Sequence, residues 1–101
     1  MRVEKYPGID KDPKGAMNPT GNIIRDAWLF GLIPETETCE GWTVGRIEAL
    51  YAQVSTEWDK YGHLASNLPP DLAIRHRQIY DAAIKRAREL GWDPDEALDQ
   101  G

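Results

Sequence analysis

The sequence contains few of the features that membrane, secreted or disulfide-stabilised proteins need. Its single cysteine, Cys39, cannot form an intramolecular disulfide bond, so nothing requires an oxidising compartment. The longest uninterrupted apolar run, 27–33, has seven residues, whereas a membrane-spanning helix needs about 20. No apolar N-terminal stretch resembles a secretory signal. We therefore expect a cytoplasmic protein that makes no membrane contact.

Positive charge is also in short supply. The 101 residues include 12 Lys and Arg against 17 Asp and Glu, which gives a formal net charge of −5. Because nucleic-acid affinity depends on clustered positive charge, this balance argues against a nucleic acid as the main partner. The acidic excess is local, since residues 35–62 contain six acidic and two basic side chains.

Motifs for catalysis and metal binding are missing as well. The sequence has no phosphate-binding glycine loop, no Gly-x-Ser-x-Gly and no His or Cys pair at zinc-ligand spacing. The segment that begins at Asp10 starts like an EF-hand loop, but Lys14 and Gly21 occupy its fifth and twelfth positions, so the bidentate carboxylate is absent. We expect no enzymatic activity and no cofactor.

What the sequence does contain is a set of helical patterns. Asn18 followed by Pro19 is a good helix start, because Asn caps free amides and Pro has a fitting φ. We expect the first helix to run from there to about Leu32, with Pro34 ending it. Its apolar residues lie nearly all round the helix, so it must be covered on more than one side.

The second helix has the most regular pattern. Thr43 is a suitable N-cap and Gly62 a suitable terminator, which predicts a helix over 43–61. Between them, apolar residues recur at steps of three and four: Val44, Ile47, Tyr51, Val54, Trp58 and Tyr61. This narrow stripe is typical of a helix that lies along another helix.

A third helix is predicted from Pro69-Pro70-Asp71 to the residue before Gly91. The connection 62–68 is short enough for neighbouring helices, so we expect the second and third helices to pack side by side in opposite directions. After Gly91, Asp93-Pro94 predicts a short helix over 96–99.

Together these patterns predict an all-α fold, namely a small three-helix bundle built on an antiparallel helical hairpin. Residues 1–17 are thinly apolar and contain Pro and Gly, so we expect a mobile, irregular N-terminal arm there. Residues 18–101 are expected to form a single helical domain that ends in the short C-terminal helix.

The aromatic content suggests a function. The chain has four Trp and four Tyr, and both residue types are enriched at protein interfaces. An unstriped apolar helix followed by an acidic loop predicts a contact surface comprising Trp28, Leu29, Phe30, Leu32, Ile33, Glu35, Glu37 and Glu40. We therefore predict a small accessory protein that binds either a second copy of itself, as a homodimer, or a larger partner protein.

Two alternatives stay open. A nucleic-acid-binding regulator would use the basic residues of the third helix: Arg75, Arg77, Lys85, Arg86 and Arg88. Against it, these side chains lie along opposite edges of the apolar face, whereas a DNA-reading helix presents several residues from one face. A ligand- or metal-binding module would use Cys39, His63 and His76.

Overall fold

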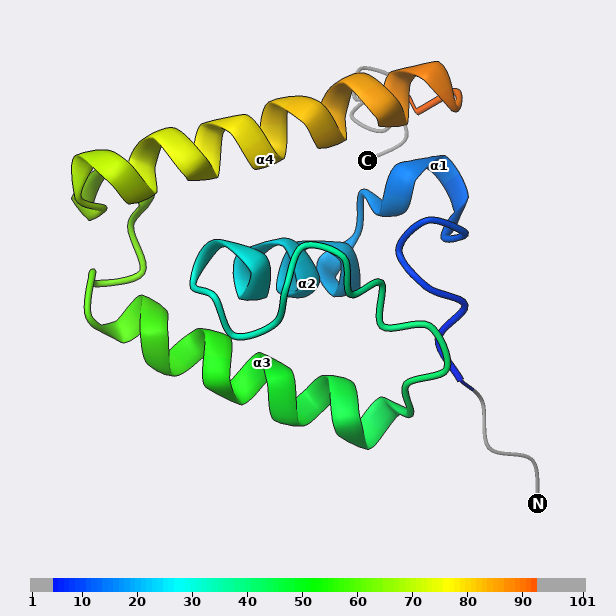
Figure 1. The fold of residues 1–101 in the computed structure, drawn as a ribbon, viewed down its shortest axis with the longest axis horizontal. Helices are drawn as coiled ribbons and strands as arrows, with labels where there is room; N and C mark the ends of the chain where they lie inside the picture. Colours follow the sequence, from blue (N-terminus) through cyan, green and yellow to red (C-terminus); the bar gives the residue numbers. More distant parts are fainter. Residues whose placement is uncertain (1–4, 93–101) are drawn as a thin grey trace, which may run out of the picture.

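The computed structural model describes residues 5–92, and within them the fold is helical (Figure 1). Its elements are α1 (Pro13–Ala16), α2 (Pro19–Leu29), α3 (Val44–Asp59), the 3-10 helix η1 (Ala65–Asn67) and α4 (Pro70–Glu89). The described residues contain no β-strand, only an isolated β-bridge between Lys5 and Thr43. The all-α class is confirmed. The predicted helix over 96–99 lies outside the described residues.

The three long helices form a layered arrangement with α2 in the middle (Figure 1). α3 and α4 run in opposite directions, as expected, but α2 lies between them and contacts both. The two outer helices approach each other near their connection, where the Trp58 and His76 rings pack edge to face with centroids 6.2 Å apart. The structure thus differs from a hairpin in which α3 and α4 pack directly on each other. α2 lies between these two helices, and its apolar surface is therefore covered on two sides.

The N-terminal segment belongs to the helical domain over its described part, 5–17. Tyr6 pairs with the chain before α3, where its amide donates to the Trp42 carbonyl at 2.8 Å and its carbonyl accepts from the Gly41 amide at 2.8 Å. The Ile9 side chain is buried in the core. Residues 5–17 thus pack against the helices, through backbone pairing with a distant segment that leaves no local sequence pattern. The mobile, irregular arm over 1–17 stays a prediction.

Helix α1 is held in place by close packing and by a buried arginine. A Cβ atom on Gly15 would lie 2.8 Å from the Ala87 Cα of α4, so only glycine allows this approach. Arg25 of α2 is 3% exposed, and its guanidinium donates to the Ala16 carbonyl at 3.0 Å and to the Gly15 carbonyl. Burial lowers the pKa of Arg25. The Arg25 guanidinium thus provides hydrogen-bond donors for carbonyl groups at the end of α1.

Helix α2 begins after Asn18, as predicted, but ends before Gly31 and not at Pro34. Asn18 caps its start, because the side-chain oxygen accepts from the Gly21 amide at 2.8 Å. The helix ends at Leu29, three residues earlier than expected. Gly31 has a φ of 71°, and the Leu32 amide donates to the Ala27 carbonyl at 2.9 Å. This is the usual glycine-terminated helix end, so Gly31 and not Pro34 stops the helix.

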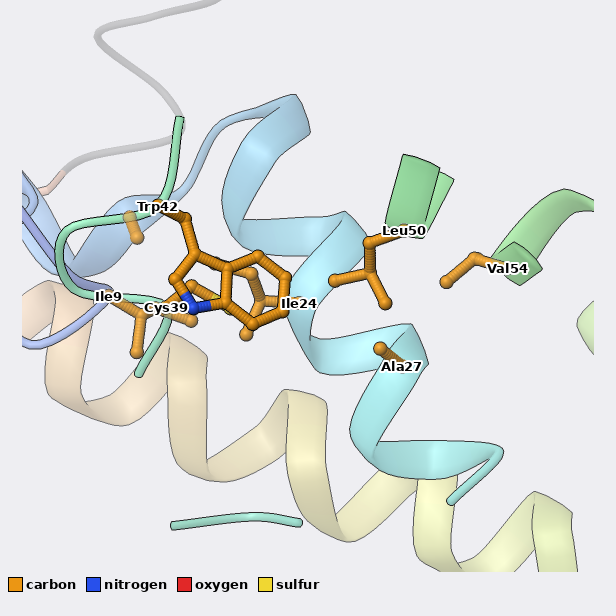
Figure 2. Close-up of a cluster of buried hydrophobic side chains, with 8 residues drawn as sticks. Ile9, Ile24, Ala27, Cys39, Trp42, Leu50 and Val54 are labelled. Carbon is orange, nitrogen blue, oxygen red and sulfur yellow. The ribbon is translucent and has the colours of Figure 1, made fainter. Parts of the chain in front are cut away.

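The core lies around α2 (Figure 2) and consists of Ile9, Ala16, Ile24, Ala27, Cys39, Trp42, Leu50 and Val54. Leu50 and Val54 project from α3 toward α2. The expected stripe of α3 is only partly internal, because Val44 is 63% exposed and Tyr51 is 57% exposed. Trp42, just before the helix, is buried at that end instead, and Leu50 occupies the place predicted for Tyr51.

Candidate functional site

The aromatic part of the predicted contact surface makes contacts inside the molecule. The half-buried Trp28 ring donates from Nε1 to the Glu37 carbonyl at 3.0 Å. Phe30 packs edge to face on Trp58 and stacks on Tyr61, with centroids 5.2 and 6.2 Å apart. The aliphatic residues of the predicted contact surface are buried or partly buried: Leu29, Leu32 and Ile33. The apolar residues that motivated a contact surface here therefore have internal partners, and the surface itself stays a prediction.

The acidic loop after α2 is also engaged within the chain. Glu35 forms an ion pair with Arg75 at 2.6 Å, and Glu40 pairs with Lys11 at 2.9 Å. The Glu37 carboxylate accepts from the Cys39 amide at 3.2 Å. The loop thus serves to connect the N-terminal segment and α4 to the centre of the fold.

An apolar opening lies elsewhere, between the N-terminal segment, α2 and the first half of α3. Its volume is about 460 Å³, and we call it the α2–α3 groove; its lining is Lys5, Tyr6, Pro7, Thr20, Ile23, Trp42, Val44, Ile47, Glu48 and Tyr51. The Arg46 guanidinium lies 3.9 Å from the centroid of the Trp42 ring. The two charged lining residues, Lys5 and Glu48, are both exposed.

A second opening, of about 320 Å³, continues along the same pair of helices. It is lined by Pro19, Asn22, Ile23, Asp26, Tyr51, Val54, Ser55, Trp58 and His63. Because Ile23 and Tyr51 border both openings, the two adjoin. The surface between α2 and α3 is therefore indented over much of the length of α3.

Asp26, in this second opening, is a structural link between three helices. One carboxylate oxygen accepts from Tyr80 OH of α4 at 2.6 Å, and the other accepts from Trp58 Nε1 of α3 at 3.0 Å. Burial, followed by this hydrogen bond, raises the pKa of Tyr80. With both oxygens bonded, Asp26 holds α3 and α4 against α2 and is explained without a ligand.

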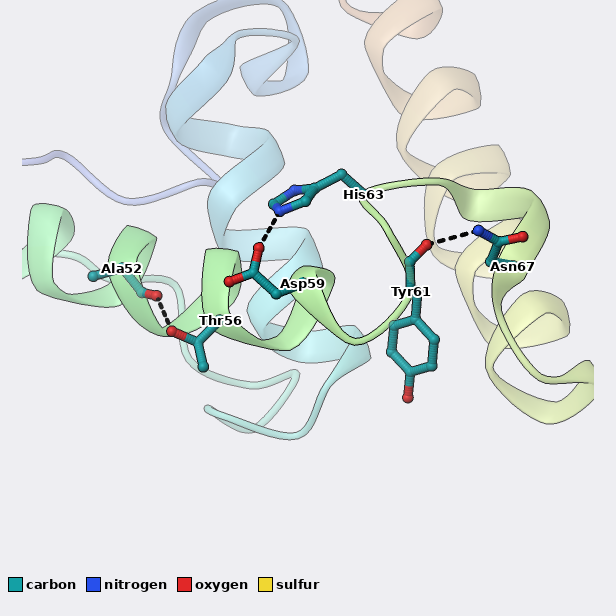
Figure 3. Close-up of polar contacts among 6 residues, drawn as sticks. All are labelled: Ala52, Thr56, Asp59, Tyr61, His63 and Asn67. Carbon is teal, nitrogen blue, oxygen red and sulfur yellow. Dashed lines mark hydrogen bonds and ion pairs between the residues drawn. The ribbon is translucent and has the colours of Figure 1, made fainter.

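His63 lies in the turn after α3, where it has a hydrogen-bond partner within the chain (Figure 3). Its ring Nε2 is bonded to the Asp59 carboxylate one turn earlier, and its φ is 59°, in the left-handed region. Nearby, the Asn67 side chain donates to the Tyr61 carbonyl at 2.9 Å. These contacts close the chain reversal between α3 and η1.

The three residues of the metal-binding alternative have separate surroundings. Cys39 is buried, and this burial, with the nearby Glu37, raises its pKa to about 11. His76 packs against Trp58 and, at 4.7 Å between centroids, against Tyr80, while His63 bonds to Asp59 as above. Across residues 5–92, no cluster of three or more His, Cys, Asp or Glu side chains is placed to hold a metal ion. The described residues therefore do not form one ligand set from these three side chains, and the ligand- or metal-binding alternative stays a prediction.

The basic residues of α4 are distributed over two flanks. Arg75 pairs with Glu35 and donates to the Trp28 carbonyl at 3.3 Å. Arg86 borders an opening that also contains Arg25, whereas Arg77 borders a different one beside η1. Lys85 and Arg88 are exposed. Nucleic-acid binding stays a prediction that this arrangement does not favour, because one groove-facing surface is what DNA reading requires.

Comparison of the chain with protein-family models, with curated proteins and with solved structures found no significant match. None of the helices in the described part of the chain is long and apolar enough to cross a membrane. Function must therefore be inferred from the surfaces of the molecule itself. Of these, the α2–α3 groove was missed by the sequence prediction, although the stripe of Val44, Ile47 and Tyr51 that forms one wall was noted as a helix-contacting seam.

Proposed function

We propose that the protein acts through protein–protein contact and that the α2–α3 groove is its contact surface. The observation that carries this proposal is the exposure of Val44 and Tyr51, at 63% and 57%, beside an apolar groove. Exposed large apolar side chains that cluster, rather than occur singly, mark interaction sites. We therefore prefer the α2–α3 groove to the surface around Trp28 as the place where a partner binds.

The shape and chemistry of the groove favour a protein helix over a small molecule. Small-molecule sites combine an enclosing pocket with converging polar groups, whereas the charged groups here, Lys5 and Glu48, are exposed. The exposed wall has helical spacing, since Val44, Ile47 and Tyr51 follow at steps of three and four. Helix-in-groove recognition uses anchors at these steps, and the stretch of α3 from Val44 to Tyr51 that lines the groove offers a wall of about 12 Å.

Site-specific photo-cross-linking tests this location. A photo-reactive amino acid replaces Tyr51 in one variant and Ile74 in the other, and both are produced in cells of the native source. Ile74 is a matched control, because it is 58% exposed but lies on α4 outside the groove. We expect a cross-linked protein product at position 51 and none at position 74. No product at position 51, or equal products at both positions, contradicts the proposal.

A further inference from the structure

Resting on the proposed contact function, we infer that the partner in the α2–α3 groove is a second copy of this chain, bound in a two-fold symmetric dimer. Such an interface is isologous, which means that one patch must be complementary to itself. The patch must therefore provide both a ridge and a groove, and its charges must match after a two-fold rotation.

The groove region provides both shapes. The ridge is formed by Val44 and Tyr51, which stand out from α3 into solvent. Directly beside it, the groove is lined by Ile23 and the buried Trp42. In a symmetric dimer the ridge of each copy can enter the groove of the other, so both features are used. An unrelated helix would need the groove alone.

The charges also suit a two-fold contact. Lys5 comes from the N-terminal segment and Glu48 from α3, and both line the groove with opposite charges. A two-fold axis that passes midway between these two residues, at right angles to the line that joins them, exchanges the positions of Lys5 and Glu48 across the interface. Lys5 of each copy then faces Glu48 of the second copy, so two ion pairs form.

Sedimentation equilibrium of the full chain tests the inference through a charge swap. We expect a wild-type dimer with a dissociation constant below about 1 mM, a range that includes weak, reversible association. Lys5→Glu and Glu48→Lys, each alone, place like charges together, so each should weaken the dimer by about tenfold or more. The double variant Lys5→Glu/Glu48→Lys should regain wild-type affinity to within about threefold, because it restores both pairs with reversed sign.

Two further variants complete the design. Tyr51→Glu should abolish the dimer, and Ile74→Glu, a matched exposed apolar position on α4, should leave it unchanged. A wild type that stays monomeric at about 1 mM, a double variant as weak as the single ones, or an Ile74→Glu as weak as Tyr51→Glu overturns the inference. If the wild type is monomeric but cross-links through position 51 to another protein, the proposed function stands and the dimer does not; without cross-links at position 51, both fail.

Discussion

Helices α2 and α3 show how differently a central and an outer helix are used in a small bundle. α2 has 11 residues, five of them buried, whereas α3 has 16 residues with only Leu50 and Val54 buried. The helix with the clearer apolar stripe is thus the less buried one. The comparison teaches that coverage is set by position between other elements, and that a regular stripe on an outer helix can leave apolar surface for a partner.

The largest expected contrast lies within α3. Trp58→Ala should lower the free energy of unfolding by about 3–5 kcal/mol, as for large aromatic truncations in cores, since Trp58 packs on Phe30 and donates to Asp26. Tyr51→Ala, on the exposed side of the same helix, should cost less than about 1 kcal/mol. Chemical denaturation measures both. Similar losses for the two variants would mean that the inner and outer sides of α3 are wrongly assigned.

The next contrast uses one glycine from each helix. A Cβ atom on Gly21 of α2 would lie 2.0 Å from the Ala16 carbonyl oxygen, whereas one on Gly45 of α3 meets nothing within 4 Å. Gly21→Ala should therefore destabilise the fold by about 3 kcal/mol, and Gly45→Ala should stabilise it by about 0.4–1 kcal/mol. Thermal and chemical unfolding report both signs. A stable Gly21→Ala protein would show that α1 does not pack closely on α2.

A smaller effect is expected from the link between α2 and α4. Tyr80→Phe removes the hydrogen bond to Asp26 and keeps the ring, so the loss of unfolding free energy at neutral pH should be about 1.5 kcal/mol. The double variant Tyr80→Phe/Asp26→Asn tests the coupling in a double-mutant cycle. Strictly additive losses would indicate that the two side chains do not interact.

High pH should weaken this same link. The pKa of Tyr80 is raised above its ordinary value of 10.0 by burial and by the bond to Asp26, and that of Tyr6 by burial and by its bond to Asp12. Their stabilising contributions are complete below pH 10 and are lost as the pH rises above it, because only the unfolded chain then releases these protons. Denaturation between pH 9 and pH 11 should show falling stability, with a shallower fall in Tyr80→Phe. An unchanged slope in that variant would contradict the assignment.

Local signals predicted the helices well because caps act over a few residues. The starts of α2, α3 and α4 follow from Asn18, Thr43 and the Pro69-Pro70 pair, and all three are confirmed. The end of α2 has an equally local signal in Gly31, whose φ of 71° ends the helix before Pro34. What the sequence could not specify is packing, because the choice of Leu50 over Tyr51 depends on where α2 lies.

The candidate site was only half predictable for the same reason. Its α3 wall is visible as a stripe in the sequence, but the stripe alone does not say which part is covered from within. The other wall comes from Lys5 and its neighbours, which pair with the chain around Trp42 through backbone hydrogen bonds. No pattern in side-chain type announces such pairing, so residues far apart in sequence were not recognised as one surface.

A dilution series followed by ¹H–¹⁵N NMR tests the central claim most directly, because it locates the contact surface residue by residue. Between about 10 μM and about 1 mM, a range that covers weak dimers, we predict amide shift changes confined to the lining of the α2–α3 groove, strongest at Val44, Ile47 and Tyr51. Changes centred instead on 28–33, or no changes at any concentration, would contradict the account.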